Sequence, residues 1–258
     1  MDLSIVTVTW NSAKYIANQI RSVFFACDGL KFEEIIIDND SHDDTVKITK
    51  EQFPQIKLIK NNYNAGFGRA YNQAISLATG KYFLYLNPDM KISGSIPALL
   101  NYLETHHEVG IVGCKLITNN GEVNKNALPR RFPRLLNVLL MFFKLHHLFP
   151  NILKDYLYQN YDWEVTHEVD SVRGSFMMVR RELVEKLGWS FDPRYYLWWE
   201  DVDLCREAKK LGYRVVYNPT VACVDEIGQS FKSRNWCLRQ WLFFKGALIY
   251  FLKWGIKN

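Results

Sequence analysis

Acidic residues that directly follow aromatic residues make one stretch of the sequence the first candidate for chemistry. In residues 191–205, three carboxylates stand at the start of a predicted helix, after four large rings. A carboxylate in such a place can accept a proton while a ring stacks on a sugar. Each feature alone also fits a charged helix start or ordinary core packing, so the interpretation depends on their combination. The carboxylates are Glu200, Asp201 and Asp203, and the rings are Tyr195, Tyr196, Trp198 and Trp199.

A second acidic position lies far upstream, at the end of an apolar run. Residues 81–86 predict a buried strand, and this strand ends at Asn87-Pro88-Asp89. A carboxylate there can hold a divalent cation, because Mg²⁺ and Mn²⁺ prefer oxygen ligands. Together the two stretches favour metal-assisted transfer of an activated sugar.

The first third of the chain alternates between strand and helix patterns. This alternation predicts an α/β fold with a doubly wound, mostly parallel sheet, which binds ligands at the carboxyl ends of its strands. Asp38 is the last residue of one predicted strand, and Asp89 follows another after Asn87-Pro88. For either one alone, capping of a helix or turn is the better explanation, but the two together, with Asn64 and Asn72 nearby, favour a binding site. The strands are predicted at residues 5–9, 34–38, 56–60 and 81–86, and a helix at 69–78.

The second half of the chain is less regular. We predict helical appendages to the sheet, namely an insertion at 132–158 of one or two amphipathic helices broken at Pro150, and a C-terminal amphipathic helix. The predicted domains are accordingly 1–235, including the insertion, and 236–258. Strands are predicted at 108–116, 169–179 and 213–218, and helices at 181–187 and at 200–211, the latter stopping at Gly212.

Length, charge and cysteine content limit the classes of protein to consider. The chain has 258 residues, 48% of them hydrophobic, which is enough for one large α/β domain with an appendage. Its net charge of +5 suits phosphorylated ligands or an anionic membrane surface. No basic run with interleaved aromatic residues indicates nucleic-acid binding, so we expect no nucleic-acid partner. Five scattered cysteines indicate neither disulfides nor zinc and favour a cytoplasmic location. We expect no signal peptide and no membrane-spanning helix.

These motifs, in this order, resemble glycosyltransferase family 2 with the GT-A fold, and most closely its bacterial rhamnosyltransferase-like branch. The resemblance covers nearly the whole chain; each motif alone is weak, whereas the ordered set is specific. The matching segments are Val8-Thr9-Trp10-Asn11, Ile37-Asp38-Asn39-Asp40-Ser41, Asn64-Ala65-Gly66-Phe67-Gly68 with Asn72, Leu86-Asn87-Pro88-Asp89, Gly174-Ser175-Phe176-Met177 with Arg180, and 191–204.

The resemblance implies a role for each matching residue. Asp201 would be the base that activates the acceptor hydroxyl, with Glu200 as the rival base. Asp89 would face Mg²⁺ or Mn²⁺. Gly174, Trp198 and Trp199 would contact the acceptor, with Trp198 the ring expected to stack on it. Core packing is the alternative for Trp199, as for Tyr195 and Tyr196, and close strand packing is the alternative for the glycine. The residues implied around the nucleotide sugar are Thr9, Asn11, Asp38, Asn64, Gly66, Asn72 and Asn87.

Two positions depart from the family pattern. Family members often carry a histidine after the last strand, and some use it at the metal, whereas residues 224–230 contain none. We expect Asp225 to substitute for it as an oxygen ligand. The family also tends to place an arginine where this chain has Glu207. Both changes bear on metal affinity and on helix geometry rather than on the class of reaction.

The resemblance implies an inverting transferase with a nucleotide-sugar donor, dTDP-L-rhamnose, and a lipid-linked saccharide as acceptor. A transferase for galactofuranose, glucose or another hexose is the nearest alternative. A non-catalytic glycan-binding subunit and a glycoside hydrolase are alternatives of other classes. The cationic, aromatic-rich segment 236–254 predicts either peripheral contact with the inner face of the cell membrane or a helix packed on the domain.

Overall fold

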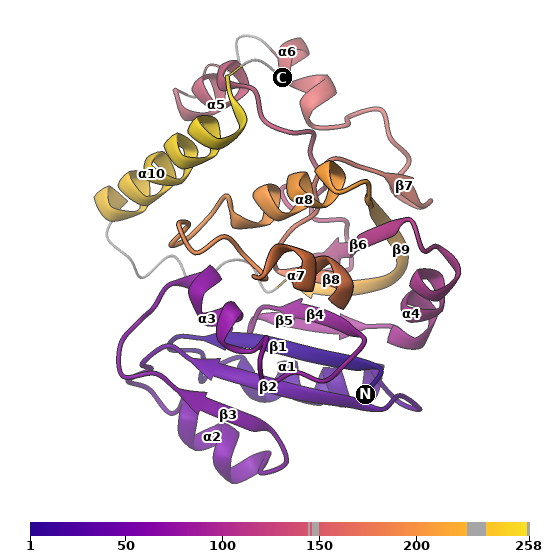
Figure 1. The fold of residues 1–258 in the computed structure, drawn as a ribbon, viewed down its shortest axis with the longest axis vertical. Helices are drawn as coiled ribbons and strands as arrows, with labels where there is room; N and C mark the ends of the chain where they lie inside the picture. Colours follow the sequence, from indigo (N-terminus) through magenta and orange to yellow (C-terminus); the bar gives the residue numbers. More distant parts are fainter. Residues whose placement is uncertain (144, 146–149, 226–235, 257–258) are drawn as a thin grey trace.

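The structure is a computed structural model that describes residues 1–143, 145, 150–225 and 236–256. One sheet forms its centre, with helices on both faces (Figure 1). The strand order is β3-β2-β1-β4-β8-β6-β9-β5, and β7 pairs with β9. The strands are β1 (Leu3–Thr9), β2 (Phe32–Asp38), β3 (Lys57–Lys60), β4 (Tyr82–Leu86), β5 (Met90–Ser93), β6 (Val109–Ile117), β7 (His167–Glu168), β8 (Phe176–Arg180) and β9 (Arg214–Asp225). The helices are α1 (Ile16–Ala26), α2 (Thr45–Gln52), α3 (Phe67–Gln73), α4 (Ile96–Thr105), α5 (Leu135–Phe142), α6 (Pro150–Tyr156), α7 (Arg181–Leu187), α8 (Glu200–Lys210) and α10 (Trp236–Trp254).

The first four strands of the sheet are parallel, and three of them, β1, β2 and β4, are buried on both faces. In β4, Leu84 and Leu86 enter the core cluster that contains α1 and α4, whereas Phe83 and Tyr85 enter the cluster that contains α3 and α8. This alternation explains why the strand is apolar at every position. The predicted α/β fold with a doubly wound sheet is confirmed, and its parallel part is β3-β2-β1-β4.

The second half of the sheet is mixed, and here two predictions were wrong in their limits. The strand predicted at 213–218 continues to Asp225, because a bulge between Tyr217 and Ala222 carries the chain past Pro219. The strand predicted at 169–179 starts only at Phe176, since the preceding residues form a loop toward α8. β5 runs antiparallel to β9, and together with α4 it lies outside the predicted elements.

The helical appendages lie next to one another at one end of the molecule (Figure 1). The described part of the insertion contains the helices α5 and α6, and Pro150 is the first residue of α6, as the predicted break requires. α10 packs on α8 through aromatic rings, with the Trp199 and Tyr250 centroids 5.3 Å apart. The half-buried Lys253 ammonium lies 2.7 Å from Asp203 and 3.1 Å from Asp192. Among the described residues, no helix has the length and apolar character that crossing a bilayer requires.

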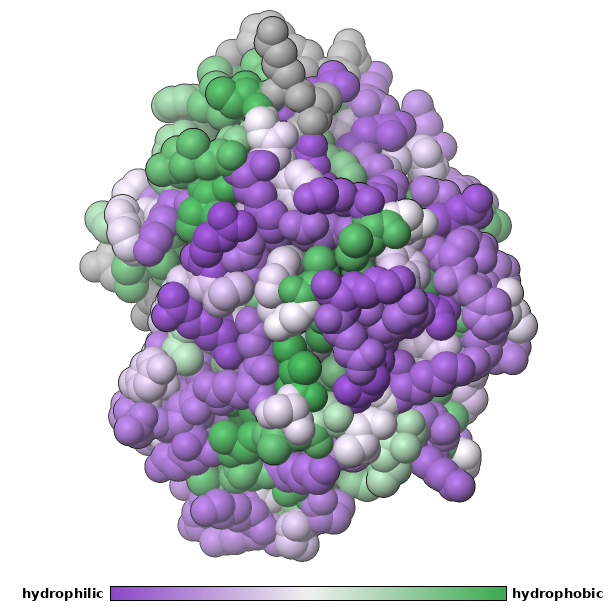
Figure 2. Space-filling model, in the orientation of Figure 1, coloured by the Kyte–Doolittle hydropathy of each residue, from purple (hydrophilic) through white to green (hydrophobic). Residues whose placement is uncertain are grey.

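α5 and α10 nevertheless leave large apolar side chains exposed. The Phe142 and Phe244 rings contact each other at 4.3 Å, so the two helices form one continuous surface. Figure 2 shows this apolar area over both helices. We call it the α5–α10 face, formed by Leu136, Leu139, Phe143, Trp241, Phe244, Leu248 and Leu252.

Candidate active site

A small pocket opens at the carboxyl ends of β1 and β4. It has a volume of about 70 Å³, and the loop that contains Tyr196 and Leu197 forms part of its wall. Gly66 has φ +89°, and a Cβ there would lie 2.7 Å from the Tyr196 ring, so only glycine fits under this loop. We call this space the strand-end pocket; Thr9, Trp10, Asn39, Asn64, Gly66, Asn87 and Asp89 are among its lining residues.

Three residues predicted to bind the nucleotide sugar do not line this pocket. Asp38 is fully buried and accepts hydrogen bonds from Thr9 Oγ1 at 2.9 Å and Ser41 Oγ at 2.6 Å. Asn72 holds the loop before α8, because its amide donates to the Phe191 carbonyl at 2.7 Å and accepts from two backbone N–H groups. Asn11 binds the loop after β2 through the His42 amide. In this structure all three hold the loops around the pocket through hydrogen bonds and do not form part of its wall.

A larger cavity of about 410 Å³ brings together the two acidic positions that the sequence separates. Asp89, at the end of β4, and Asp201, in the first turn of α8, both line it. Asp225 lies on its wall beside Asp89, since β5 and β9 pair Met90 with Asp225. We call this space the central cavity; its walls also contain Asn87, Arg173, Gly174, Trp198 and Glu200.

Two consecutive tryptophans form the turn that orients the start of α8. Trp198 and Trp199 have φ angles of 64° and 73°, a left-handed conformation that costs about 1–2 kcal/mol per residue. Packing on α10 compensates this cost, because the buried Trp199 indole donates to the Phe243 carbonyl and lies where a Cβ on Gly246 would be. Trp198 lines the central cavity, whereas Trp199 mainly joins α8 to α10. The sharp turn places the carboxylates of Glu200 and Asp201 at the cavity.

The two adjacent carboxylates have different environments. Burial raises the pKa of Glu200 well above its ordinary value, and the neighbouring Asp201 charge adds to this effect. Glu200 Oε2 is buried without a hydrogen-bond partner, which fits a protonated acid rather than an anion. Asp201 is half-buried and accepts a hydrogen bond from the Gly174 amide at 3.1 Å. Asp201 is therefore the better proton acceptor of the pair.

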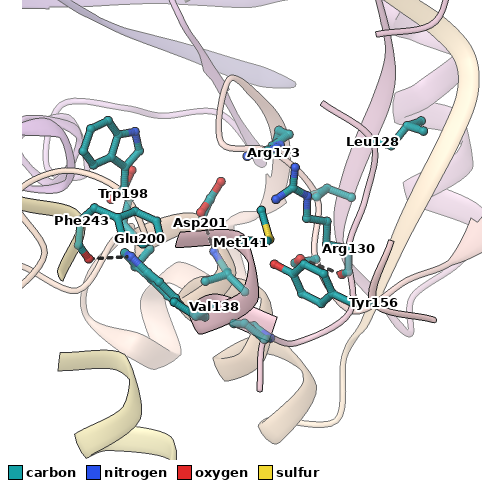
Figure 3. A pocket seen from close by; sticks show the side chains of 15 residues that line it. Leu128, Arg130, Val138, Met141, Tyr156, Arg173, Trp198, Glu200, Asp201 and Phe243 are labelled. Carbon is teal, nitrogen blue, oxygen red and sulfur yellow. Dashed lines mark hydrogen bonds between the residues drawn. The ribbon is translucent and has the colours of Figure 1, made fainter. Parts of the chain in front are cut away.

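A third space, on the other side of Asp201, was not predicted from the sequence. This side cavity has a volume of about 370 Å³ and shares Arg173, Trp198, Glu200 and Asp201 with the central cavity (Figure 3). Arg130 lines it as well, and Figure 3 shows its guanidinium next to that of Arg173. The available sequence signal was the position of Arg173 directly before Gly174.

The residues around Asp89 are suited to bind a divalent cation together with a phosphate-containing ligand. No group of three or more His, Cys, Asp or Glu side chains gathers in the described ranges, so the protein alone does not enclose an ion there. Asn87 Oδ1, however, is buried without a hydrogen-bond partner beside Asp89, and Asp225 lies on the same cavity wall. Two carboxylates and an amide oxygen suit Mg²⁺ or Mn²⁺ when phosphate oxygens complete the coordination.

Comparison with solved structures identifies the fold. A mannosyltransferase from Pyrobaculum calidifontis, solved with GDP-Man and Mn²⁺, superposes with a TM-score of 0.63 at 18% identity, covering 97% of this chain and 63% of that one. S. aureus TarS 1–349 with UDP-GlcNAc gives a TM-score of 0.61 at 19% identity, covering 91% and 62%. The chain thus spans less than two thirds of either solved chain. These neighbours confirm the predicted GT-A fold.

Comparison of sequences identifies the family. The N-acetylglucosaminyl-diphospho-decaprenol L-rhamnosyltransferase of Mycobacterium tuberculosis is 27% identical over 231 residues, covering 84% of this chain and 74% of that protein. Rhamnosyltransferase WbbL of Escherichia coli K12 is 29% identical over 163 residues, covering 60% and 58%. The model of the family described as glycosyl transferase family 2 matches residues 4–188, and the chain therefore belongs to this family of glycosyltransferases.

Proposed function

We propose that the protein is an inverting, metal-dependent glycosyltransferase that moves L-rhamnose from dTDP-L-rhamnose to a hydroxyl of a lipid-linked saccharide in cell-surface polysaccharide synthesis. The observation that carries this proposal is the convergence of Asp89 and Asp201 on one cavity. The choice of sugar is supported by the names of the two rhamnosyltransferase relatives, and the choice of acceptor by the name of the Mycobacterium tuberculosis relative. An Escherichia coli relative named as a UDP-Glc-dependent glucosyltransferase, 27% identical over 139 residues, supports glucose as the alternative.

The donor and the acceptor would enter from different sides. We assign the donor nucleotide to the strand-end pocket, where Thr9, Asn64 and Gly66 lie, and its diphosphate to the region of Asn87 and Asp89. Asp89 and Asp225 would hold the metal, which supplies positive charge that stabilises the diphosphate leaving group. The acceptor would reach Asp201 from the side cavity, with Trp198 beside its ring and Gly174 close to the base.

The reaction is a single displacement in this proposal. Asp201 takes the proton of the acceptor hydroxyl as the hydroxyl oxygen forms a bond to the anomeric carbon of the donor sugar. The bond from that carbon to the diphosphate breaks on the opposite face, and its electron pair leaves with the diphosphate oxygen. Attack from the opposite face inverts the configuration of the anomeric carbon.

The α5–α10 face supports peripheral membrane contact. Its exposed rings and leucines include Trp241 at 57% and Leu252 at 78% exposure. Aromatic and aliphatic side chains on a helix face insert into the bilayer interface, and nearby Arg239 and Lys245 favour anionic lipids. We therefore propose that the enzyme works at the inner face of the cell membrane, where a lipid-linked acceptor is available.

A panel of nucleotide sugars tests the function directly. The protein is incubated with Mn²⁺ or Mg²⁺ and each donor, with or without a saccharide linked through diphosphate to a lipid, and release of nucleoside diphosphate is measured. We expect metal-dependent release with dTDP-L-rhamnose that increases with acceptor. Release from UDP-Glc instead would replace rhamnose with glucose, and an absence of release and of nucleotide binding across the panel would contradict a transferase and favour a glycan-binding subunit.

A further inference from the structure

Two arginines in the side cavity have no part in the mechanism proposed above. Arg130 lies just before the insertion and Arg173 in the loop before β8, yet both guanidiniums donate to the same carbonyl oxygen of Asn126, at 3.2 and 2.5 Å. Figure 3 shows the two groups pointing toward one another. A shared acceptor between two cations holds them close together despite their repulsion.

The pair has no carboxylate within ion-pair distance in the part of the chain that the structure describes. Burial lowers the pKa of Arg173, and the charge of Arg130 lowers it further, while Asp201 acts in the opposite direction. Two partly desolvated cations side by side are unfavourable unless an anion accompanies them. Paired guanidiniums offer several N–H donors in fixed planes, an arrangement that matches phosphate oxygens.

Apart from Tyr156, Ser171 and the carboxylates of Glu200 and Asp201, the rest of the side cavity is lined mainly by apolar side chains. Leu128, Val138, Met141 and Phe243 are among these side chains, so a ligand bound here would place charge against the arginines and hydrocarbon against the apolar residues. Val138 and Met141 belong to α5 and Phe243 to α10, the two helices that carry the exposed α5–α10 face. The cavity therefore has an apolar side on the same helices that would meet a membrane.

We infer that Arg130 and Arg173 bind the diphosphate of the lipid-linked acceptor, with its hydrocarbon chain along α5 and α10 and its saccharide at Asp201. This inference rests on the proposed function and adds to it the residues that hold the acceptor's diphosphate and the placement of the acceptor in the side cavity. The donor diphosphate is the less suitable ligand, because Arg130 lines neither the strand-end pocket nor the central cavity. Since Arg173 and Asp201 line the same two cavities, the sugar attached to the diphosphate is the one that would present its hydroxyl to the base.

Direct binding tests the inference without catalysis. Calorimetry measures the affinity of the full chain for farnesyl diphosphate, farnesol and inorganic pyrophosphate, without donor. We expect farnesyl diphosphate to bind more tightly than farnesol or inorganic pyrophosphate. Arg130→Gln or Arg173→Gln should weaken the affinity for farnesyl diphosphate by about ten- to a hundredfold, which is the loss expected for a hydrogen bond to a charged group. Arg131→Gln is the matched control, because Arg131 pairs with Asp155 outside the cavity. Failure of the parent protein to bind farnesyl diphosphate would overturn the inference, whatever the donor panel shows.

Two further measurements separate this site from other anion sites. In the transfer assay, the arginine variants should raise KM for an acceptor with a diphosphate by about tenfold or more and leave KM for the donor unchanged; a changed donor KM with an unchanged acceptor KM would overturn the assignment. Binding to phosphatidylglycerol vesicles should be equal in parent and variants, and loss of vesicle binding with intact farnesyl diphosphate binding would show that the pair recognises lipid headgroups instead. Thermal unfolding of each variant shows whether a loss of binding is a loss of fold.

Discussion

The amide nitrogen of Gly174 lies 3.1 Å from Oδ2 of Asp201, although 27 residues separate the two in the chain. A Cβ at position 174 would lie 3.1 Å from the Asp201 Cβ, closer than most real Cβ contacts. The glycine therefore does two things, since it donates a hydrogen bond to the proposed base and leaves room for its side chain. The loop before β8 and the start of α8 form one unit through this contact.

Gly174→Ala should lower kcat by about ten- to a hundredfold, because a small displacement of a reacting group has an effect of that order. The donor KM should change little, since the strand-end pocket is untouched. Gly188→Ala is the matched control: its φ of +77° makes alanine unfavourable, but nothing lies within 4 Å of the added carbon. We expect this control to lower the unfolding temperature and keep its kcat. Equal kcat for Gly174→Ala and the parent would contradict a positioning role.

Asp201→Asn should reduce kcat by about 10²–10⁴-fold, the range for loss of a general base, and should retain donor affinity. Glu200→Gln is the informative comparison. The raised pKa of Glu200 favours its protonated form, which is neutral like the amide of glutamine. We expect Glu200→Gln to retain most of the activity. Steady-state kinetics with saturating metal measures both variants. If Glu200→Gln proved more damaging than Asp201→Asn, the base assignment would be reversed.

Asp89→Ala should weaken capture of the donor rather than the chemical step. In the parent we expect Mn²⁺ to increase the affinity for nucleoside diphosphate by about tenfold or more, and a chelator to remove this gain, because the ion joins the carboxylate to the phosphates. In Asp89→Ala the gain should be absent, while Asp155→Ala, a change at an exposed carboxylate, should keep it. Calorimetric titration with and without metal compares the three. If Mn²⁺ increased the nucleoside diphosphate affinity of Asp89→Ala as much as that of the parent, the metal would bind at a site that does not include Asp89.

The sequence predicted those parts of the site that lie in regular elements. Asp89 and Asp201 each follow a clear local signal, a strand end and a helix start, and the order of motifs indicated that they converge. The apolar runs likewise predicted β1, β2 and β4, because strands buried on both faces are apolar throughout. Local patterns of this kind are set by burial, which a single sequence records directly.

Other parts depend on contacts between distant segments. Nothing local distinguishes an Asn72 that binds the loop at Phe191 from one that binds a nucleotide, nor an Asp38 held by Thr9 from one facing a ligand. The pairing of Arg130 with Arg173 arises only because the loop before β8 passes the start of the insertion. Such relations are properties of the fold, so the structure had to supply them.

The pH dependence of stability should reflect Glu34. Burial raises the pKa of Glu34 to about 8, although a hydrogen bond from Gln19 acts in the opposite direction. The Gln19 amide donates to Glu34 Oε1 at 3.0 Å, whereas Glu34 Oε2 is buried without a hydrogen-bond partner, which suits a protonated acid better than an anion. The native state therefore keeps this proton at a pH where the unfolded chain has lost it.

The sign of the effect follows from this difference in bound protons. Between the ordinary value of 4.5 and about 8, the free energy of unfolding should fall by about 1.4 kcal/mol per pH unit from this group, and change no further above that range. Glu34→Gln, which cannot ionise, should flatten the profile and be more stable than the parent near pH 8. Urea unfolding at several pH values measures both proteins; parallel profiles would show that Glu34 is ionised in the fold.

The α5–α10 face should bind membranes through residues that contribute little to the fold. Trp241, Leu248 and Leu252 are exposed on α10 at spacings of seven and four residues, so they lie on one side of the helix. Replacing all three with serine removes apolar area that a bilayer would bury and leaves the Trp199 and Tyr250 contacts intact. We expect at least about a tenfold loss of vesicle binding in sedimentation, because full burial of one such side chain is worth about 1.5–3 kcal/mol.

Two controls give this experiment its meaning. Phe25→Ser removes a ring that is 81% exposed on α1, away from this face, and should leave vesicle binding unchanged. Transfer to a water-soluble, short-chain acceptor should be equal in the triple variant and the parent, since the two cavities are not altered. Transfer to an acceptor embedded in vesicles should fall in proportion to the lost binding. If the triple variant bound vesicles as well as the parent, the α5–α10 face would not be the membrane-binding surface, because the variant lacks the apolar area that this face would bury in the bilayer.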